Sequence, residues 1–120
     1  MSRAPTGPKA LRAQPNRVRR PLPIFWTERA LADLEAIRDY ITRDNRAAAQ
    51  RWVAKLIAAV ESAAAAPVAA RRVPEVGRTD VREVLLRTYR IVYRVSDSRI
   101  CVLTVFEGHR LFPGDIERSE

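Results

Sequence analysis

The spacing of apolar residues changes period once along this chain, and that change restricts the fold more than any other feature. Between residues 28 and 66, apolar side chains recur every three or four positions, as they do along one face of an α-helix. After residue 80, short runs of β-branched and aromatic residues follow one another, which is typical of strands. Helices followed by strands therefore account for most of the chain.

Two helices are predicted in the first of these regions. The short apolar run Ile24–Trp26 predicts a strand, and Thr27 is a residue type that caps the helix we expect at residues 28–43. Asn45 can cap a second helix, whose apolar stripe continues until Pro67 stops it. Because only a residue or two joins the helices, they must form an antiparallel hairpin.

Three strands are predicted after the helices, at residues 81–87, 89–95 and 99–106, with a turn at Ser96–Ser98. The breaks between them are short enough for hairpins, so we expect an antiparallel meander. Alternation along the middle strand places two tyrosines on one face and two arginines on the other. The predicted fold is α+β, with a short N-terminal strand and a helical hairpin packed on a three- to four-stranded antiparallel sheet.

One domain accommodates these elements. The chain has 120 residues, of which 47% are hydrophobic, and this is enough for a core without metals or disulfides. We expect the domain to cover residues 24–113, with a C-terminal tail at 114–120. Trp52 falls on an apolar helical stripe and Cys101 in an apolar strand, so both are expected in the core, the cysteine as a reduced thiol.

The net charge of +8 is concentrated in a tail. Five of the eight prolines and six of the 22 lysines and arginines lie in residues 1–23, with none of the 14 acidic residues, so this basic segment is expected to be disordered. It is either a solvated extension or a source of weak, nonspecific attraction to nucleic acid. The remainder is nearly balanced, so a polyanion partner depends on where particular arginines lie.

Several classes of protein are disfavoured. The chain has no run of about 18 apolar residues and no apolar signal region after its first positive charges, so we expect a cytoplasmic protein without a membrane partner. His109 is the single histidine and Cys101 the single cysteine, which predicts neither a metal site nor a cofactor.

Five short segments carry a resemblance to a known family. They are Trp26–Leu34, Tyr40–Ile41, Val81–Val84, Tyr89–Val95 and Val105–Arg110. Their order and spacing resemble the RelE/ParE toxin superfamily over residues 24–113, with Arg82–Arg94 and the Gly-x-Arg ending as the strongest pieces. The resemblance implies a toxin of a type II toxin-antitoxin system.

The superfamily contains two functional groups. RelE-like members cleave mRNA in the ribosomal A site, whereas ParE-like members poison DNA gyrase. RNA cleavage without a metal needs a base, an acid and cations that stabilise the phosphorane. By resemblance, Arg90 and Arg110 match positions of catalytic arginines in the nucleases, and His109 beside Glu107 is the remaining proton carrier. His109 is otherwise an ordinary surface loop residue.

Other positions depart from the nuclease pattern. Val84 takes a lysine position, and no tyrosine follows Tyr93, where the nucleases usually place one near the C-terminus. These departures favour a gyrase inhibitor that is not itself an enzyme. The alternatives are an mRNA endonuclease and an interaction module that has lost toxicity.

Five arginines are candidates for contact with the antitoxin or the target: Arg82, Arg87, Arg90, Arg94 and Arg110. They equally suit a solvated sheet face or local ion pairs. The resemblance implies a cognate antitoxin that is acidic and partly disordered when free, bound across the helical hairpin and the sheet edge. Operator DNA is expected to bind only through the antitoxin, because nothing here resembles a recognition helix.

Overall fold

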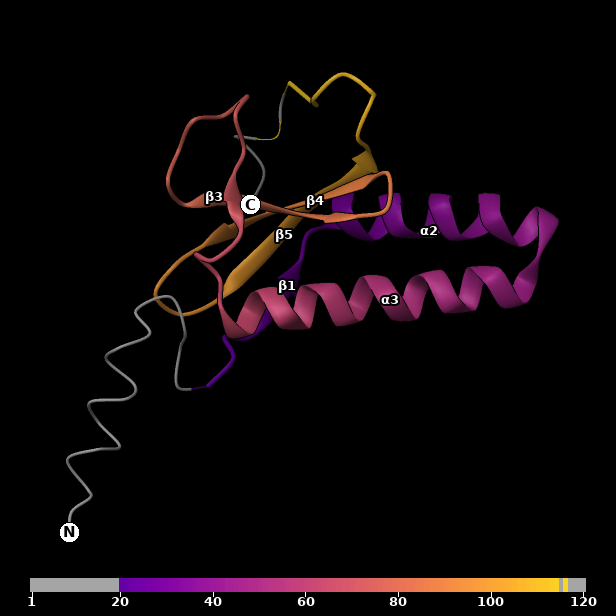
Figure 1. Ribbon diagram of the computed structural model, residues 1–120, viewed down its shortest axis with the longest axis horizontal. Helices are drawn as coiled ribbons and strands as arrows, with labels where there is room; N and C mark the ends of the chain where they lie inside the picture. The colour runs from indigo at the N-terminus through magenta and orange to yellow at the C-terminus, as the bar shows by residue number, and fades with distance from the viewer. Residues whose placement is uncertain (1–19, 115, 117–120) are drawn as a thin grey trace, which may run out of the picture.

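The computed structural model describes residues 20–114 and 116. Strand β1 (Ile24–Trp26) leads into helices α2 (Glu28–Asp44) and α3 (Arg46–Ala65), as Figure 1 shows. Four strands follow: β2 (Arg71–Arg72), β3 (Val81–Leu86), β4 (Tyr89–Val95) and β5 (Ile100–Glu107). Most of both predicted tails lies outside the described residues.

The sheet has five strands in the order β1-β5-β4-β3-β2. The α+β class, the helical hairpin and the antiparallel meander β3-β4-β5 are confirmed. The sheet is larger than expected and mixed, because β1 pairs in parallel with β5 and β2 pairs antiparallel with β3. Both strands lie at edges of the sheet. The sequence predicted β1 as a strand but not its parallel partner, whereas β2 has only two residues, which leaves no alternation to recognise.

Both helices begin at the residues that the sequence predicts. The Thr27 Oγ1 accepts a hydrogen bond from the Ala30 N–H at 3.0 Å and also donates to the Val102 carbonyl oxygen at 2.9 Å. The Asn45 Oδ1 accepts from the Ala48 N–H at 2.9 Å, while the Asn45 N–H closes α2 on the Ile41 carbonyl. One asparagine therefore ends α2 and begins α3, which makes the hairpin tight.

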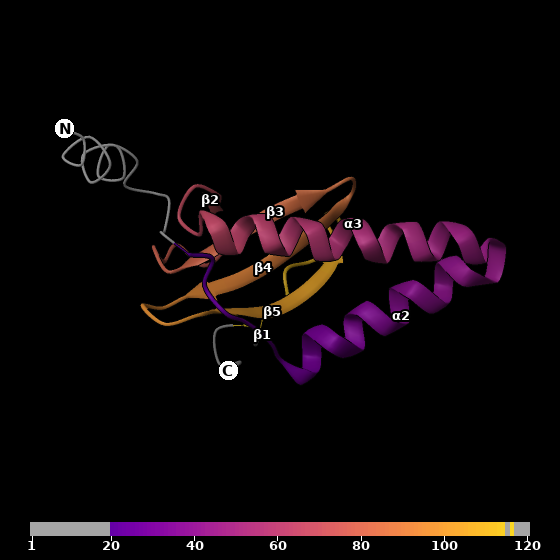
Figure 2. The same cartoon turned by 90° about the horizontal axis from the view of Figure 1, so that it is seen from below.

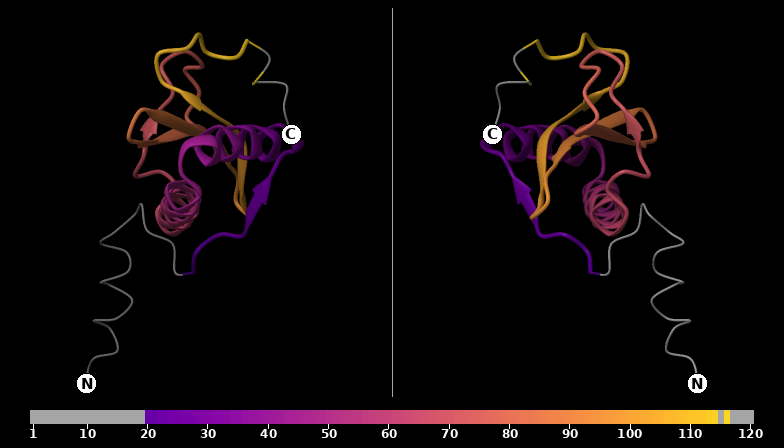
Figure 3. Two further views of the ribbon diagram at one scale, coloured as in Figure 1. Left: turned by 90° about the vertical axis from the view of Figure 1, so that its right-hand side faces the viewer. Right: turned by 90° about the vertical axis from the view of Figure 1, so that its left-hand side faces the viewer.

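The helical hairpin covers one face of the sheet (Figure 3). Trp52 and Leu56 of α3 pack there against Ile91 and Tyr93 of β4, and the predicted core position of Trp52 is confirmed. Burial raises the pKa of Tyr93 to about 12, and its hydroxyl donates to the Pro67 carbonyl oxygen at 2.6 Å. The turn of the hairpin extends beyond the sheet, as Figure 2 shows.

The opposite face of the sheet is also covered. Val92, Cys101 and Leu103 form a second apolar cluster there with Val73 and Ile116, and the cysteine is buried as predicted. Val73, which follows β2, and Ile116, which lies after β5, thus help to cover this face of the sheet. The face that carries Arg90 is therefore largely packed rather than solvated.

A register shift in β5 sets which side chains reach that face. The pairing of β4 with β5 slips at Val92/Tyr93, so that Leu103 has no partner residue in β4. Val105 then joins the helix-side cluster, while Phe106 packs against the opposite cluster. Strict alternation from Val102 would have placed these two residues the other way round.

Within the described residues, no helix is long and apolar enough to cross a membrane.

Candidate functional site

A groove of about 630 Å³ lies between α2, the C-terminal half of β5 and the loop that follows it. Its floor includes Ile37, Tyr89 and Val105, and its rim includes Tyr40 and Leu111. Leu111 is 95% exposed and Tyr40 is 66% exposed. Large apolar side chains held in solvent beside a groove are typical of a surface that binds another molecule.

One wall of this groove is the edge of a strand. Strand β1 pairs with β5 only at residues 100–102, so within the part of the chain that the structure describes no strand covers this edge of β5 farther along. Helix α2 takes over part of the edge, because the Asp33 Oδ2 accepts hydrogen bonds from the Thr104 hydroxyl at 2.5 Å and the Val105 N–H at 3.1 Å. The edge beyond Val105 borders the groove, where an extended peptide can add as a strand.

The charges around the groove are mixed, with positive charge in excess. Arg29, Arg43 and Arg110 line it, against Asp33 and Glu107. The Asp33 carboxylate is already committed to β5. The groove therefore suits a ligand that combines apolar and acidic side chains.

A second cluster of charge lies at the other face of the sheet, around Arg90. Its guanidinium donates from Nε to the Glu83 Oε1 at 2.7 Å, and from Nη1 and Nη2 to the two carboxylate oxygens of Glu75 at 2.9 and 2.8 Å. Arg71 donates to the other oxygen of Glu83 at 2.5 Å. Two arginines and two glutamates thus alternate in one network, in which Glu83 is fully buried and Arg90 is 8% exposed.

Aromatic rings cover the Arg90 guanidinium. Its Cζ lies 5.2 Å from the centroid of the Phe106 ring and 5.5 Å from that of Phe112. Gly108 lies beside the aliphatic part of the same side chain, where a Cβ would be 3.5 Å from the Arg90 Cγ. The loop after β5 therefore packs closely over Arg90.

This network shifts the titration of its members. The hydrogen bonds from Arg90 lower the pKa of Glu75 to about 2, and the carboxylate of Glu75 in turn raises the pKa of Arg90. Both groups are charged at neutral pH, and each stabilises the charged form of the other.

The structure places the other arginine candidates in different settings. Arg82 donates to three backbone carbonyls, those of Val68, Ala70 and Thr79, and so ties two loops to β3. Arg94 is half-buried and is among the charges that lower the pKa of Asp80, after the direct hydrogen bond from Arg78.

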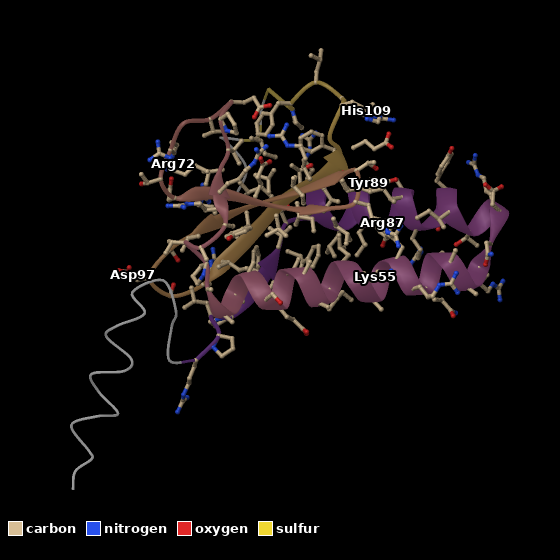
Figure 4. The ribbon with its side chains drawn as sticks, viewed as in Figure 1. Lys55, Arg72, Arg87, Tyr89, Asp97 and His109 are labelled. Atoms are coloured by element: carbon tan, nitrogen blue, oxygen red, sulfur yellow. The ribbon has the colours of Figure 1, made fainter. Side chains whose placement is uncertain are left out.

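Arg87 lies at the β3–β4 turn, exposed, with a φ of +55°, a left-handed conformation that is uncommon outside glycine. In Figure 4 it lies at the same end of the sheet as Tyr89, with Lys55 of α3 below.

The proposed acid and base, Glu107 and His109, lie at the end of β5 and on the loop after it, on either side of the glycine that packs against Arg90. His109 is 73% exposed on the loop after β5, with its Nε2 3.3 Å from the Glu107 carboxylate, and Arg110 lines the groove. Figure 4 shows His109 on this loop and Arg72 on the opposite side of the molecule. Glu107 and His109 are brought together, whereas the Arg90 guanidinium is committed to Glu75 and Glu83.

Sequence reasoning missed the partners of Arg90 and the role of Asp33. Glu83 lies on the same face of β3 as the buried Val81. A carboxylate on a buried strand face needs a cationic partner, and this pattern could have indicated one. Glu75 and Phe112 lie in loops without any periodic pattern, so no sequence signal pointed to them. Among the described residues, no group of His, Cys, Asp or Glu is arranged to hold a metal ion.

Comparison with known proteins decides the family. Residues 24–112 match the family described as the ParE toxin of the type II toxin-antitoxin system parDE. The chain belongs to the ParE toxin family.

Two relatives and one solved structure support the wider RelE/ParE toxin superfamily. The chain is 38% identical to "Toxin RelE2" of Caulobacter vibrioides over 73% of its own length and 97% of that protein. It is 39% identical to "Putative toxin Y4kP" of Sinorhizobium fredii, over 75% and 92% respectively. The solved structure, the chromosomal ParDE TA system from P. aeruginosa, superposes with a TM-score of 0.59 at 26% identity, covering 72% of this chain and 95% of that one. By its family, the chain is a toxin of a type II toxin-antitoxin system, with an antitoxin as its partner.

Proposed function

We propose that this toxin acts as an inhibitor of DNA gyrase in the cytoplasm rather than as a nuclease. The observation that carries the proposal is the state of Arg90, the arginine that resembles a catalytic residue of the RelE-like enzymes. Three of its N–H groups donate to carboxylates, and two phenyl rings cover its guanidinium. A scissile phosphate has no access to a cation held in this way.

The arrangement of the remaining groups supports the same proposal. Arg82 is bound to backbone carbonyls, and Glu107 and His109 pair with each other, while the Arg90 guanidinium is occupied by Glu75 and Glu83. Nuclease chemistry needs base, acid and cations converging on one phosphate. A gyrase inhibitor needs only a binding surface.

A ribosome-dependent mRNA endonuclease is the second candidate. It is favoured by the Glu107–His109 pair at 3.3 Å beside Arg110, and by the similarity to a relative named as a RelE toxin. In this case His109 and Arg110 would be the working groups, with Arg90 only holding the loop over the sheet.

The partner proposal concerns the groove. We place an apolar and acidic segment of the cognate antitoxin there, added to β5 beyond Val105, with its acidic side chains near Arg43 and Arg110. Such a segment would be disordered alone and fold on binding. Operator DNA would be bound through the antitoxin.

The deciding experiment is expression of the full chain from a tightly repressed promoter. Plasmid supercoiling, gyrase–DNA cleavage complexes and the integrity of translated mRNA are measured in the same cells. We expect cleavage complexes to accumulate while mRNA stays intact. Cutting of ribosome-bound mRNA with normal supercoiling would contradict the proposal, and unimpaired growth would indicate an interaction module.

Matched variants assign the residues. His109→Gln and Arg110→Gln should leave mRNA intact, as the wild type does, and Arg51→Gln on the exposed side of α3 is the charge control for Arg110→Gln. If the wild type cuts mRNA and either loop variant stops it while Arg51→Gln does not, the endonuclease replaces the gyrase proposal.

A further inference from the structure

One edge of the sheet is left partly uncovered at β3. Strand β2 pairs with β3 only at residues 82–83, so within the described residues no strand lies beside residues 84–86. The Val73 N–H donates to the Val81 carbonyl oxygen at 3.3 Å, so the backbone groups of Val81 point toward β2. Because these directions alternate along a strand, the N–H and C=O of Leu85 point to the same side, past the end of β2. Among residues 20–114, no backbone group pairs with them there.

The side chain of Leu85 is exposed at the same place. It is 56% exposed, whereas its neighbours Val84 and Leu86 point to the other face of the sheet and pack under the helical hairpin. Unpaired backbone groups beside an apolar side chain are the means by which a sheet edge takes up an extended polypeptide. Nucleic acid has no peptide backbone to pair with such an edge, so this surface favours a protein partner.

The turn beside this edge holds an arginine in a strained backbone conformation. Residues 87 and 88 join β3 to β4, and Arg87 has a φ of +55°. Two-residue hairpin turns favour glycine at such a position, because a Cβ is disfavoured in left-handed backbone. The Arg87 side chain is exposed and forms no ion pair with residues 20–114, so no contact within this part of the chain explains an arginine here. A strained residue at the surface is typical of a functional site.

A lysine adds a second positive charge at this end of the molecule. Lys55 lies on α3, the helix that packs beneath β3, and Figure 4 shows it at the same end of the molecule as Arg87. Lys55 is also exposed and has no ion pair among the described residues. Two unpaired cations favour an acidic partner segment. They disfavour a second copy of this chain, which would bring the same charges together.

We propose that the uncovered edge of β3, with Leu85, Arg87 and Lys55, binds an extended acidic segment of the toxin's target protein as an additional strand. This inference rests on the proposed function, in which the target is DNA gyrase. The backbone groups of Leu85 position the segment, and the two cations select its acidic side chains. Strands β5 and β3 lie toward opposite edges of the sheet, so the target and the antitoxin segment placed at β5 use different edges.

The test measures the affinity of the purified full chain for purified DNA gyrase. Arg87→Gly removes the charge and relieves the backbone, so it should weaken binding about tenfold while it raises the urea midpoint of unfolding. A loss of affinity in a variant that is more stable than the wild type is not due to misfolding. Leu85→Thr keeps a residue suited to a strand but removes the apolar contact, and it should also weaken binding about tenfold.

Two control variants match these changes at other places. Arg72→Gln removes one positive charge from β2, on the opposite side of the molecule in Figure 4, and Val68→Thr replaces another exposed apolar residue. Both controls should bind gyrase like the wild type. Wild-type affinity in both Arg87→Gly and Leu85→Thr, or an equal loss in the controls, would overturn the docking surface and leave gyrase inhibition in place. Failure of the wild type itself to bind gyrase would overturn the gyrase proposal, and with it the assignment of this edge to that target.

Discussion

Gly108 lies where the loop after β5 crosses the β3–β4 turn. Its N–H donates to the Thr88 carbonyl oxygen at 2.6 Å, and a Cβ at this position would lie 3.1 Å from that same oxygen. The close approach matters because the same loop carries Phe112 over Arg90. The first residue of the Gly-x-Arg ending is thus explained by packing, whatever the arginine does.

Replacing Gly108 with alanine should therefore destabilise the domain. The Thr88 oxygen belongs to the backbone and can retreat only by distorting the turn, so we expect a loss of roughly 1–3 kcal/mol in the free energy of unfolding. Gly114→Ala is the control, since nothing lies within 4 Å of its Cβ position. Urea denaturation measures both, and equal effects would contradict the packing argument.

Glu75 should make stability depend on acid. Its pKa is about 2 in the folded chain against an ordinary value of 4.5, so the unfolded chain takes up the proton first as the pH falls. The stabilisation is complete above about pH 5 and is lost between there and pH 2. The urea midpoint should consequently fall less between pH 6 and pH 3 for Glu75→Gln than for the wild type, and an equal fall would show that the pair with Arg90 adds no stability.

At the level of single residues, the sequence predicted positions whose cause is local or periodic. Thr27 and Asn45 were found because a cap is defined by its neighbours, and Trp52 because it lies on an apolar stripe. Glu75 was not found, because its partner lies fifteen positions away on another element and no local pattern marks it. The five arginines were selected by residue type, by strand alternation and, for Arg90 and Arg110, by family resemblance. None of these reveals which carboxylates surround Arg90.

Helix α2 and strand β5 are joined side by side through one aspartate. The Asp33 carboxylate accepts hydrogen bonds from the Val105 N–H and the Thr104 hydroxyl. Both residues are buried, so these two donors would lose this acceptor without Asp33. This contact also fixes the distance between the two walls of the groove.

Asp33→Ala should accordingly cost about 1–3 kcal/mol of unfolding free energy, because the strand groups lose their acceptor. Asp39→Ala is the matched control on the same helix, since Asp39 is exposed and, among residues 20–114, pairs with its neighbour Arg38 alone. Thermal or urea denaturation of both variants tests this. Antitoxin affinity should fall only for Asp33→Ala, and a control that behaves identically would argue against Asp33 as the link.

For whole elements, the sequence succeeded where a period persists. Helices α2 and α3 and strands β3 to β5 each carry several repeats of their pattern, so their type and limits were predicted to within a residue or two. The three residues of β1 predicted a strand but not its parallel partner, because pairing between distant segments leaves no trace in local spacing.

Over the whole molecule, stability depends on the layer between the hairpin and the sheet. Leu56 is fully buried in that layer, whereas Ile57, the next residue on α3, is 43% exposed. Leu56→Ala should cost roughly 2–5 kcal/mol of unfolding free energy through lost burial and a cavity. Ile57→Ala should cost less than about 1 kcal/mol. Calorimetry of the two variants measures both losses. A larger loss for Ile57→Ala than for Leu56→Ala would mean that α3 turns a different face toward the sheet.

The parallel pairing of β1 with β5 has a consequence for the order in which the chain acquires its shape. The first strand of the sheet has its partner in the last, so the two helices emerge from the ribosome well before the sheet that covers their apolar face can be completed. A nascent chain that stops before Ile100 holds a helical hairpin with an uncovered face and no groove. We therefore expect toxicity to require completed synthesis, and prematurely ended chains to become substrates for chaperones and proteases.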